Sequence, residues 1–155
     1  MIDKIINICS SRGLTIGLAE SCTGGMISEM ITSVSGSSKV FKGAIVSYSD
    51  NIKESLLDVS KETLITYGAV SEETAREMVL GCRKKLLTDI CVSVTGIAGP
   101  TGGSVEKPVG LVYIGLLVGR NIPLLRKYKF NGNRDEIRRQ SAAAVIKLIY
   151  EALSI

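Results

Sequence analysis

The 155-residue sequence contains no histidine. A chain without imidazole cannot build a Ser-His-Asp triad, a Cys-His dyad or a zinc site that depends on histidine. If the chain is an enzyme, its proton carrier has to be lysine, tyrosine, aspartate, glutamate or cysteine. This absence narrows the search for catalytic residues more than any other property of the composition.

Long apolar runs and closely spaced cysteines are missing as well. The longest apolar stretch, residues 109–118, is far shorter than the roughly 20 residues that span a bilayer, so we expect no membrane segment. The N-terminal residues include an acid and no long apolar stretch, so we expect no signal peptide. No C-x-x-C pair occurs, and four widely spaced cysteines are typical of reduced, buried thiols in a cytoplasmic protein; they are Cys9, Cys22, Cys82 and Cys91.

The chain has only a modest excess of positive charge, with a formal net charge of +4. That balance favours an anionic small molecule, but it falls short of the basic stripe of a dedicated DNA-binding protein. Tyrosine and phenylalanine are few and scattered, so they offer no stacking platform for nucleic acid. We therefore expect an anionic small molecule as the partner, rather than nucleic acid or a membrane.

The pattern of apolar residues indicates a folded domain. Hydrophobic residues make up 45% of the chain and charged residues 22%, which is typical of globular proteins. Periodicity predicts helices over 2–11, 25–33 and 52–57, further helices that begin after Ser60, Ser71 and Asn133, and strands over 14–18, 41–49, 88–95, 109–118 and 124–130. Asp50 and Asn51 are placed to cap the helix at 52–57.

This order of elements predicts the fold class. Helices alternate with strands, and a hairpin and a last helix follow, which indicates a single α/β domain over residues 1–155. We expect three α/β/α layers around a mixed, mostly parallel sheet of about five strands. In open α/β sheets, ligands bind beyond the carboxyl ends of the strands. That rule predicts one crevice formed by the loops at 20–25, 47–53 and 96–103.

The first of these loops can hold a nucleophile. A strand that runs into a helix through Glu20-Ser-Cys-Thr-Gly-Gly25 exposes unpaired N–H groups at the positive end of a helix dipole. Ser21 could attack there, with Lys53 as a general base if its amine is neutral and with Tyr48 as a relay. The structural alternative is that Ser21 only caps the helix, that Lys53 is solvated and that Tyr48 packs at the edge of the core.

Cys22 is a competing nucleophile, because a helix N-terminus lowers the pKa of a thiol. We rank it below Ser21, since Cys22 has no histidine partner and a cysteine next to a strand end is often buried.

The glycine-rich loop at 96–103 matches neither the dinucleotide fingerprint nor the P-loop. Its backbone could approach a phosphate or only shape a turn. Arg134, Arg138 and Arg139 could meet a phosphate, or could pair with neighbouring acids.

Six segments occur in an order that resembles the CinA carboxy-terminal domain family, in its free-standing form, the nicotinamide-nucleotide amidohydrolases of PncC type. The resemblance extends from about Leu14 to Ala152. Its segments are Ala19-Glu-Ser-Cys-Thr-Gly-Gly25, Tyr48-Ser-x-x-x-Lys53, Tyr67-Gly-Ala-Val-Ser71, Gly96-Ile-Ala-Gly-Pro-x-Gly-Gly-Ser104, Lys107-Pro-Val-Gly110 and Arg134-x-x-x-Arg-Arg-Gln140.

The resemblance implies hydrolysis of the carboxamide of nicotinamide mononucleotide to nicotinate mononucleotide and ammonia, in pyridine-nucleotide salvage. It also implies a cytoplasmic, metal-free and cofactor-free serine amidase that forms a homodimer. Ser21 would be the nucleophile, with Tyr48 and Lys53 handling protons. The residues that we expect to contact substrate are Glu20, Thr23, Gly24, Gly25, Gly96, Gly99, Gly102 and Arg138.

Two positions depart from the family pattern. Asp50 stands where the family usually has asparagine, and Asn133 stands where aspartate is common. An acid at position 50 would repel a phosphate but would favour a pyridinium ring, so this departure bears on substrate preference rather than on reaction class. Two other functions stay open at this point. They are a catalytically silent nucleotide-binding domain and an accessory protein linked to competence or DNA damage.

Overall fold

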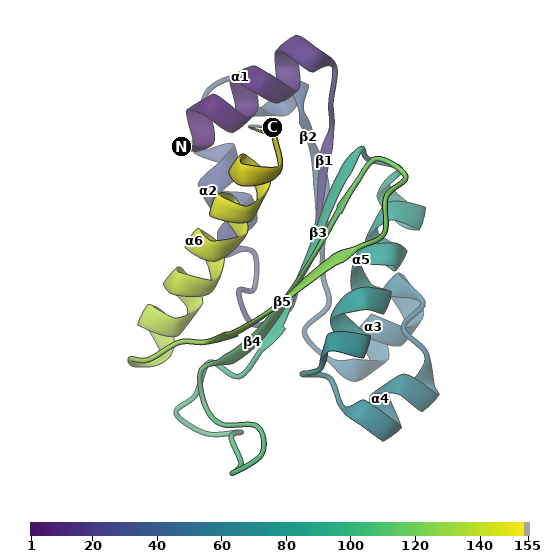
Figure 1. Ribbon diagram of the computed structural model, residues 1–155, viewed down its shortest axis with the longest axis vertical. Helices are drawn as coiled ribbons and strands as arrows, with labels where there is room; N and C mark the ends of the chain where they lie inside the picture. The colour runs from purple at the N-terminus through teal and green to yellow at the C-terminus, as the bar shows by residue number, and fades with distance from the viewer. Residues whose placement is uncertain (154–155) are drawn as a thin grey trace.

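The computed structural model describes residues 1–153, which form three layers with the sheet in the middle (Figure 1). The strands are β1 (Ile16–Glu20), β2 (Phe41–Val46), β3 (Ile90–Gly96), β4 (Leu111–Val118) and β5 (Leu124–Lys129). The helices are α1 (Ile2–Arg12), α2 (Met26–Thr32), α3 (Asp50–Leu57), α4 (Lys61–Tyr67), α5 (Glu72–Leu86) and α6 (Arg134–Leu153), with a 3₁₀ turn, η1, at Ser37–Lys39. The predicted α/β class and the five-stranded mixed sheet are confirmed.

The sheet has the strand order β2-β1-β3-β4-β5. Strand β1 pairs in parallel with β2 and with β3, whereas β3–β4 and β4–β5 are antiparallel. Parallel and antiparallel pairings are therefore balanced, and the expected excess of parallel pairs is absent. The physical reason is that β3, β4 and β5 are joined without crossover helices, and such direct connections reverse the strand direction.

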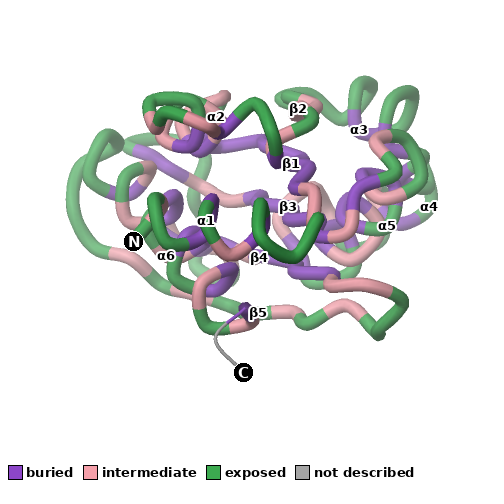
Figure 2. The backbone as a smooth tube through the Cα atoms, turned by 90° about the horizontal axis from the view of Figure 1, so that it is seen from above, coloured by how far each residue is buried: buried purple, intermediate pink, exposed green. Residues whose placement is uncertain are grey.

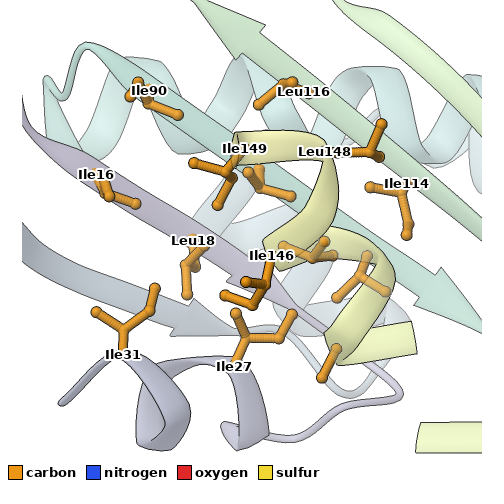
Figure 3. Packing of buried hydrophobic residues seen from close by; sticks show 14 of the residues in the cluster. Ile16, Leu18, Ile27, Ile31, Ile90, Ile114, Leu116, Ile146, Leu148 and Ile149 are labelled. Atoms are coloured by element: carbon orange, nitrogen blue, oxygen red, sulfur yellow. The ribbon is translucent and has the colours of Figure 1, made fainter. Parts of the chain in front are cut away.

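Each face of the sheet carries its own core. Helices α1, α2 and α6 cover one face, and α3, α4 and α5 cover the other (Figure 1). The central strands β1, β3 and β4 are largely buried between these layers, whereas the outer surfaces of the helices are exposed (Figure 2). Figure 3 shows the core on the first face, whose labelled members are Ile16, Leu18, Ile27, Ile31, Ile90, Ile114, Leu116, Ile146, Leu148 and Ile149.

Helix ends follow the signals in the sequence. Gly13 ends α1 in the left-handed conformation, and the Ser60 and Ser71 side chains cap α4 and α5. Asn133 and Glu136 form a reciprocal capping box at α6, with bonds of 2.7 and 2.9 Å between side chain and backbone.

Several predicted boundaries are wrong by two or three residues: β2 ends at Val46 rather than at 49, and β3 and β4 each begin two residues later than expected. Ser49, rather than Asp50 or Asn51, caps α3, because the Ser49 hydroxyl accepts from Ile52 N and Asp50 lies in the first turn. Strand β1 begins two residues later than the expected 14–18, since Thr15 N donates to the Asp89 carboxylate. No helix in the described part of the chain is both long enough and apolar enough to cross a membrane.

Helix α5 lies against the end of α3 at Gly81. A Cβ atom at this position would overlap the backbone carbonyl of Leu57 at the end of α3. The α3–α5 contact, which supports the helix that carries Lys53, therefore requires a glycine at position 81.

We predict that Gly81→Ala lowers the free energy of unfolding by about 1–3 kcal/mol, because overpacking forces the two helices apart. Urea unfolding followed by circular dichroism measures this loss. Leu80→Ala, at an exposed position on the same helix, is the matched control and should change the value by less than about 0.5 kcal/mol. Equal midpoints for wild type and Gly81→Ala would contradict this account of the packing.

Candidate active site

The carboxyl ends of the parallel strands β2, β1 and β3 lie side by side and open into a cavity of about 270 Å³. The loops that follow these strands all contribute to its walls, as the ligand rule for open sheets predicts. The cavity is lined by Ser21, Cys22, Tyr48, Asp50, Lys53, Ala69, Val70, Thr95, Gly96, Ile97, Ala98, Gly99, Thr101, Gly102 and Arg134.

Ser21 and Lys53 meet inside this cavity. Lys53 Nζ lies 3.0 Å from Ser21 Oγ and donates a second hydrogen bond of 2.8 Å to the backbone carbonyl of Ser47. Lys53 is only 1% exposed, although lysine is almost never fully buried without a charged partner. The solvated lysine considered from the sequence is thus excluded by its burial, and the serine–amine contact is direct.

The surroundings of Lys53 favour its neutral form. Burial lowers the pKa of the Lys53 amine from its ordinary value of 10.5, because removal from water penalises the ammonium. The nearby Asp50 carboxylate opposes this effect and raises the pKa. A neutral amine can accept the Ser21 proton through its lone pair, in the reverse of the hydrogen bond that the ammonium donates.

Cys22 is a poor competitor for the role of nucleophile. Burial raises the pKa of its thiol to about 11, so the thiol stays protonated near neutral pH and lacks the nucleophilic form. The expected lowering of the Cys22 pKa by the helix N-terminus is therefore outweighed by the effect of burial, which raises it. Cys9, Cys22, Cys82 and Cys91 are all free and buried, as predicted.

Glu20 shapes the loop that carries Ser21. Its fully buried carboxylate accepts five hydrogen bonds of 2.6–3.2 Å. The donors are the Thr23 hydroxyl, the backbone N–H groups of Gly25 and Ile27, and both the N–H and the hydroxyl of Ser28. Glu20 and Thr23 therefore lie behind the loop and outside the cavity lining, where they fix its shape; contact of either with substrate stays a prediction.

Over residues 22–25 of this loop, two N–H groups have acceptors among the described residues and two do not. Gly24 N donates to Ser21 O and Gly25 N donates to Glu20, so both are occupied. Within residues 1–153, the N–H groups of Cys22 and Thr23 have no oxygen acceptor. The oxyanion donors expected over residues 22–25 are thus narrowed to these two groups.

Tyr48 and Arg134 lie together at the mouth of the cavity. Arg134 Nη2 donates to the Tyr48 hydroxyl at 2.9 Å, and Nη1 donates to Gly99 O at 2.7 Å. Tyr48 is 61% exposed, and its described hydrogen bonds include none to Ser21 or Lys53. A relay through Tyr48 therefore has no direct contact here and stays a prediction.

Arg138 lies one helical turn after Arg134 but has a different position. It donates to the backbone carbonyls of Cys22 at 3.1 Å and Thr23 at 2.8 Å, so it ties α6 to the Ser21 loop. It is not among the residues that line the cavity, whereas Arg134 is. Substrate contact by Arg138 stays a prediction, and Arg134 is the arginine that the structure places in the cavity wall.

Of the predicted glycines, Gly96, Gly99 and Gly102 line the cavity, whereas Gly24 and Gly25 do not. The glycine-rich loop joins β3 to β4 at the lower end of the molecule in Figure 1. Lys107, at the far end of this loop, donates to the carbonyl of Tyr67 and so attaches the loop to the end of α4.

Sequence reasoning missed two groups. The wall formed by Ala69 and Val70 belongs to a segment whose apolar side chains give no signal beyond the resemblance. The Ser47 carbonyl that holds Lys53 has no signal, since every residue has a carbonyl. The described residues contain no cluster of three or more cysteine, aspartate or glutamate side chains that could hold a metal ion.

Comparisons with known proteins agree with this architecture. A family model described as the CinA C-terminal domain matches residues 1–153. A CinA-like protein of Kosmotoga olearia is 49% identical over 149 residues, which are 96% of this chain and 36% of that protein. The chain spans about a third of the length of the curated relatives that it matches.

Solved structures share the fold over nearly the whole chain. The competence/damage inducible protein CihA from Agrobacterium tumefaciens is 40% identical with a TM-score of 0.93, over 99% of this chain and 93% of that one. The competence or damage-inducible protein from Enterobacter asburiae is 29% identical with a TM-score of 0.91, over 98% of this chain and 95% of that one.

We predict that Glu20→Gln lowers the free energy of unfolding by about 3 kcal/mol, because an amide nitrogen would face backbone and hydroxyl donors in a buried site. Urea unfolding measures the change. Glu29→Gln, on the exposed side of α2, should stay within about 0.5 kcal/mol of wild type. If both variants unfold at the wild-type urea concentration, Glu20 does not organise the loop.

Proposed function

The chain belongs to the CinA C-terminal domain family, and we propose that it is an amidohydrolase that converts nicotinamide mononucleotide to nicotinate mononucleotide and ammonia. The names of its relatives refer to competence and damage and specify no reaction. The substrate is therefore taken from the resemblance to the PncC-type amidohydrolases, and the site supports the reaction class. The proposal depends chiefly on one observation, the buried contact of 3.0 Å between Ser21 Oγ and Lys53 Nζ.

In the acylation step, neutral Lys53 accepts the proton of Ser21 while Ser21 Oγ bonds to the carboxamide carbon. The carbonyl oxygen becomes an oxyanion, for which the N–H groups of Cys22 and Thr23 are the available donors. Lys53 then gives its proton to the amide nitrogen, the carbon–nitrogen bond breaks, and ammonia leaves. The acyl group is now an ester of Ser21.

In the deacylation step, the same amine serves again. Lys53 takes a proton from water as the water oxygen attacks the ester carbon, and the oxyanion occupies the same position as before. The bond from the carbon to Ser21 Oγ breaks, and the proton returns from Lys53 to Ser21. The product is the carboxylic acid, and the enzyme is back in its starting state.

The charges of the cavity suit a substrate that has charge of both signs. Asp50 lies near the Lys53 amine, where its carboxylate would favour the positive pyridinium ring next to the carboxamide. Arg134 lies in the wall with Tyr48 and Gly99, where its guanidinium would favour the phosphate. Since Asp50 lies on the side of the reacting amine, this arrangement supports a substrate whose pyridinium ring lies near Asp50 and whose phosphate lies near Arg134.

We predict that Ser21→Ala reduces kcat for ammonia release from nicotinamide mononucleotide by roughly 10³-fold or more, since the nucleophile is lost. Cys22→Ala should stay within about tenfold of wild type, because the thiol is protonated and unreactive. Ammonia release and formation of nicotinate mononucleotide are measured together, with the thermal midpoint as a check on folding. Retention of activity by Ser21→Ala together with its loss in Cys22→Ala would reverse the assignment.

The same assay separates an enzyme from a silent nucleotide-binding domain. A silent domain would be stabilised by nicotinamide mononucleotide in a thermal shift experiment but would release no ammonia. Wild-type protein that binds without turnover would therefore overturn the proposed function.

We predict that kcat/KM rises with pH along a limb whose apparent pKa lies below 10.5, because Lys53 must lose its proton before it can act as a base. Asp50→Asn should move this limb to lower pH, since removal of the negative charge further lowers the pKa of Lys53. Glu54→Gln, an exposed neighbour on α3, is the control and should leave the limb in place. A limb that moves to higher pH in Asp50→Asn would contradict the assignment of Lys53.

A further inference from the structure

Ser47, whose carbonyl accepts a hydrogen bond from the reacting amine, also carries an unpartnered hydroxyl. Its side-chain oxygen is the one buried side-chain nitrogen or oxygen atom of the described residues that has no hydrogen-bond partner. The residue is 0% exposed. Buried hydroxyl groups without a partner are rare in native structures, because the lost hydrogen bonds to water are not replaced.

The strand geometry places this hydroxyl on the side of the sheet from which Lys53 comes. Ser47 N donates to Glu20 O at 2.8 Å, so Ser47 continues the pairing of β2 with β1. Side chains alternate along a strand. Because Ile45 packs on the core under α5 and Ala44 packs on the opposite core, Ser47 faces the layer of α3 and α5.

The backbone of the same residue already holds Lys53. Lys53 Nζ donates to Ser47 O at 2.8 Å and lies 3.0 Å from Ser21 Oγ. An ammonium has three N–H groups, and among the described residues only these two acceptors are within hydrogen-bond distance of it. When Lys53 takes the Ser21 proton in the proposed reaction, the third N–H would need an acceptor in a buried site.

We propose that Ser47 is a positioning residue for Lys53, which holds the neutral amine through its carbonyl and accepts the third N–H of the ammonium through its hydroxyl after rotation about χ1. This inference rests on the proposed function. The proton passes only from Ser21 Oγ to Lys53 Nζ and back, and no bond to Ser47 is made or broken. The unpartnered hydroxyl of the resting state becomes a partner when the charge forms.

The sign of the effect follows from the charge state that the hydroxyl favours. A hydrogen bond accepted from the ammonium raises the pKa of Lys53, so removal of the hydroxyl lowers it. The other titratable groups around the cavity are Cys22 from the Ser21 loop, Tyr48 after β2, Asp50 from α3 and Arg134 from α6. Ser47→Ala leaves all four unchanged, so a shift in titration would report on the hydroxyl.

The test compares Ser47→Ala with wild type. We expect the limb of kcat/KM to move to lower pH and kcat on the plateau to fall by roughly tenfold, as for the loss of a hydrogen bond to a charged group. The thermal midpoint should stay the same or rise, because a buried hydroxyl without a partner is removed. Ser47→Thr, which keeps the hydroxyl, should retain the wild-type limb.

Ser93→Ala is the matched control. Ser93 is also fully buried, but its hydroxyl donates to Ala75 O at 2.6 Å on α5. Its loss should lower the thermal midpoint and leave the pH limb unmoved, which is the opposite pattern to that of Ser47→Ala. A limb and a kcat that are unchanged in Ser47→Ala would overturn the role of the hydroxyl.

A readout without turnover separates this inference from the proposed function. The 13Cε chemical shift of Lys53, followed by NMR from neutral to alkaline pH, reports the protonation of the amine directly. We expect its midpoint to lie at lower pH in Ser47→Ala than in wild type. An identical midpoint overturns the inference, whereas the absence of ammonia release by wild type overturns only the proposed function.

Discussion

The candidate site depends on the buried carboxylate of Glu20, which does not line the cavity. Glu20 is the last residue of β1 and is fully buried, and five donors from the following turn and the first turn of α2 converge on its two oxygens. A buried carboxylate is tolerated only where donors of this kind replace water. The chain satisfies Glu20 by closing the turn over 21–25 and the first turn of α2 around it. Ser21 is therefore positioned by the requirement to satisfy Glu20.

The second constraint is the burial of an amine. A chain without histidine has no side chain that titrates near neutral pH unless the protein shifts a pKa. Removal of Lys53 from water supplies that shift, and the end of β2 and the first turns of α3 supply the geometry. The hydrogen bond to the Ser47 carbonyl fixes the position of the Lys53 amine, and the same nitrogen lies within hydrogen-bond distance of Ser21 Oγ. Asp50 moderates the shift, which keeps the amine a stronger base than burial alone would leave it.

The sequence predicted those parts of the site that local chemistry determines. Serine caps, the Asn133–Glu136 box and the turn after β1 are short-range features, and they were located to within two residues. Ser21 and Lys53 followed from the absence of histidine, since few other residue types can form a nucleophile and a base. Topology then brought them together, because parallel neighbouring strands end at the same edge of the sheet.

The sequence did not predict features that depend on exact placement. Glu20 was interpreted as a substrate contact, since nothing in the sequence tells whether an acid at a strand end faces the cavity or the loop behind it. The balance of parallel and antiparallel pairs was also missed, because the order in which strands lie in a sheet depends on contacts between segments far apart in the sequence. The role of the Ser47 carbonyl could be found only in coordinates.

Arg134 and Arg138 of α6 have different contacts, although they lie close together in the sequence. Arg134 and Arg138 lie one turn apart on the same helix, and the sequence offers no means to choose between them. Arg138 is committed to the carbonyls of Cys22 and Thr23. Arg134 uses one N–H on Gly99 and one on Tyr48, which leaves three of its five N–H groups. An anionic group could therefore bind to Arg134 without displacing the contacts that hold the cavity wall, whereas recruitment of Arg138 would loosen the loop of the nucleophile. Under the proposed function, the arginine that can bind substrate at least structural cost is Arg134.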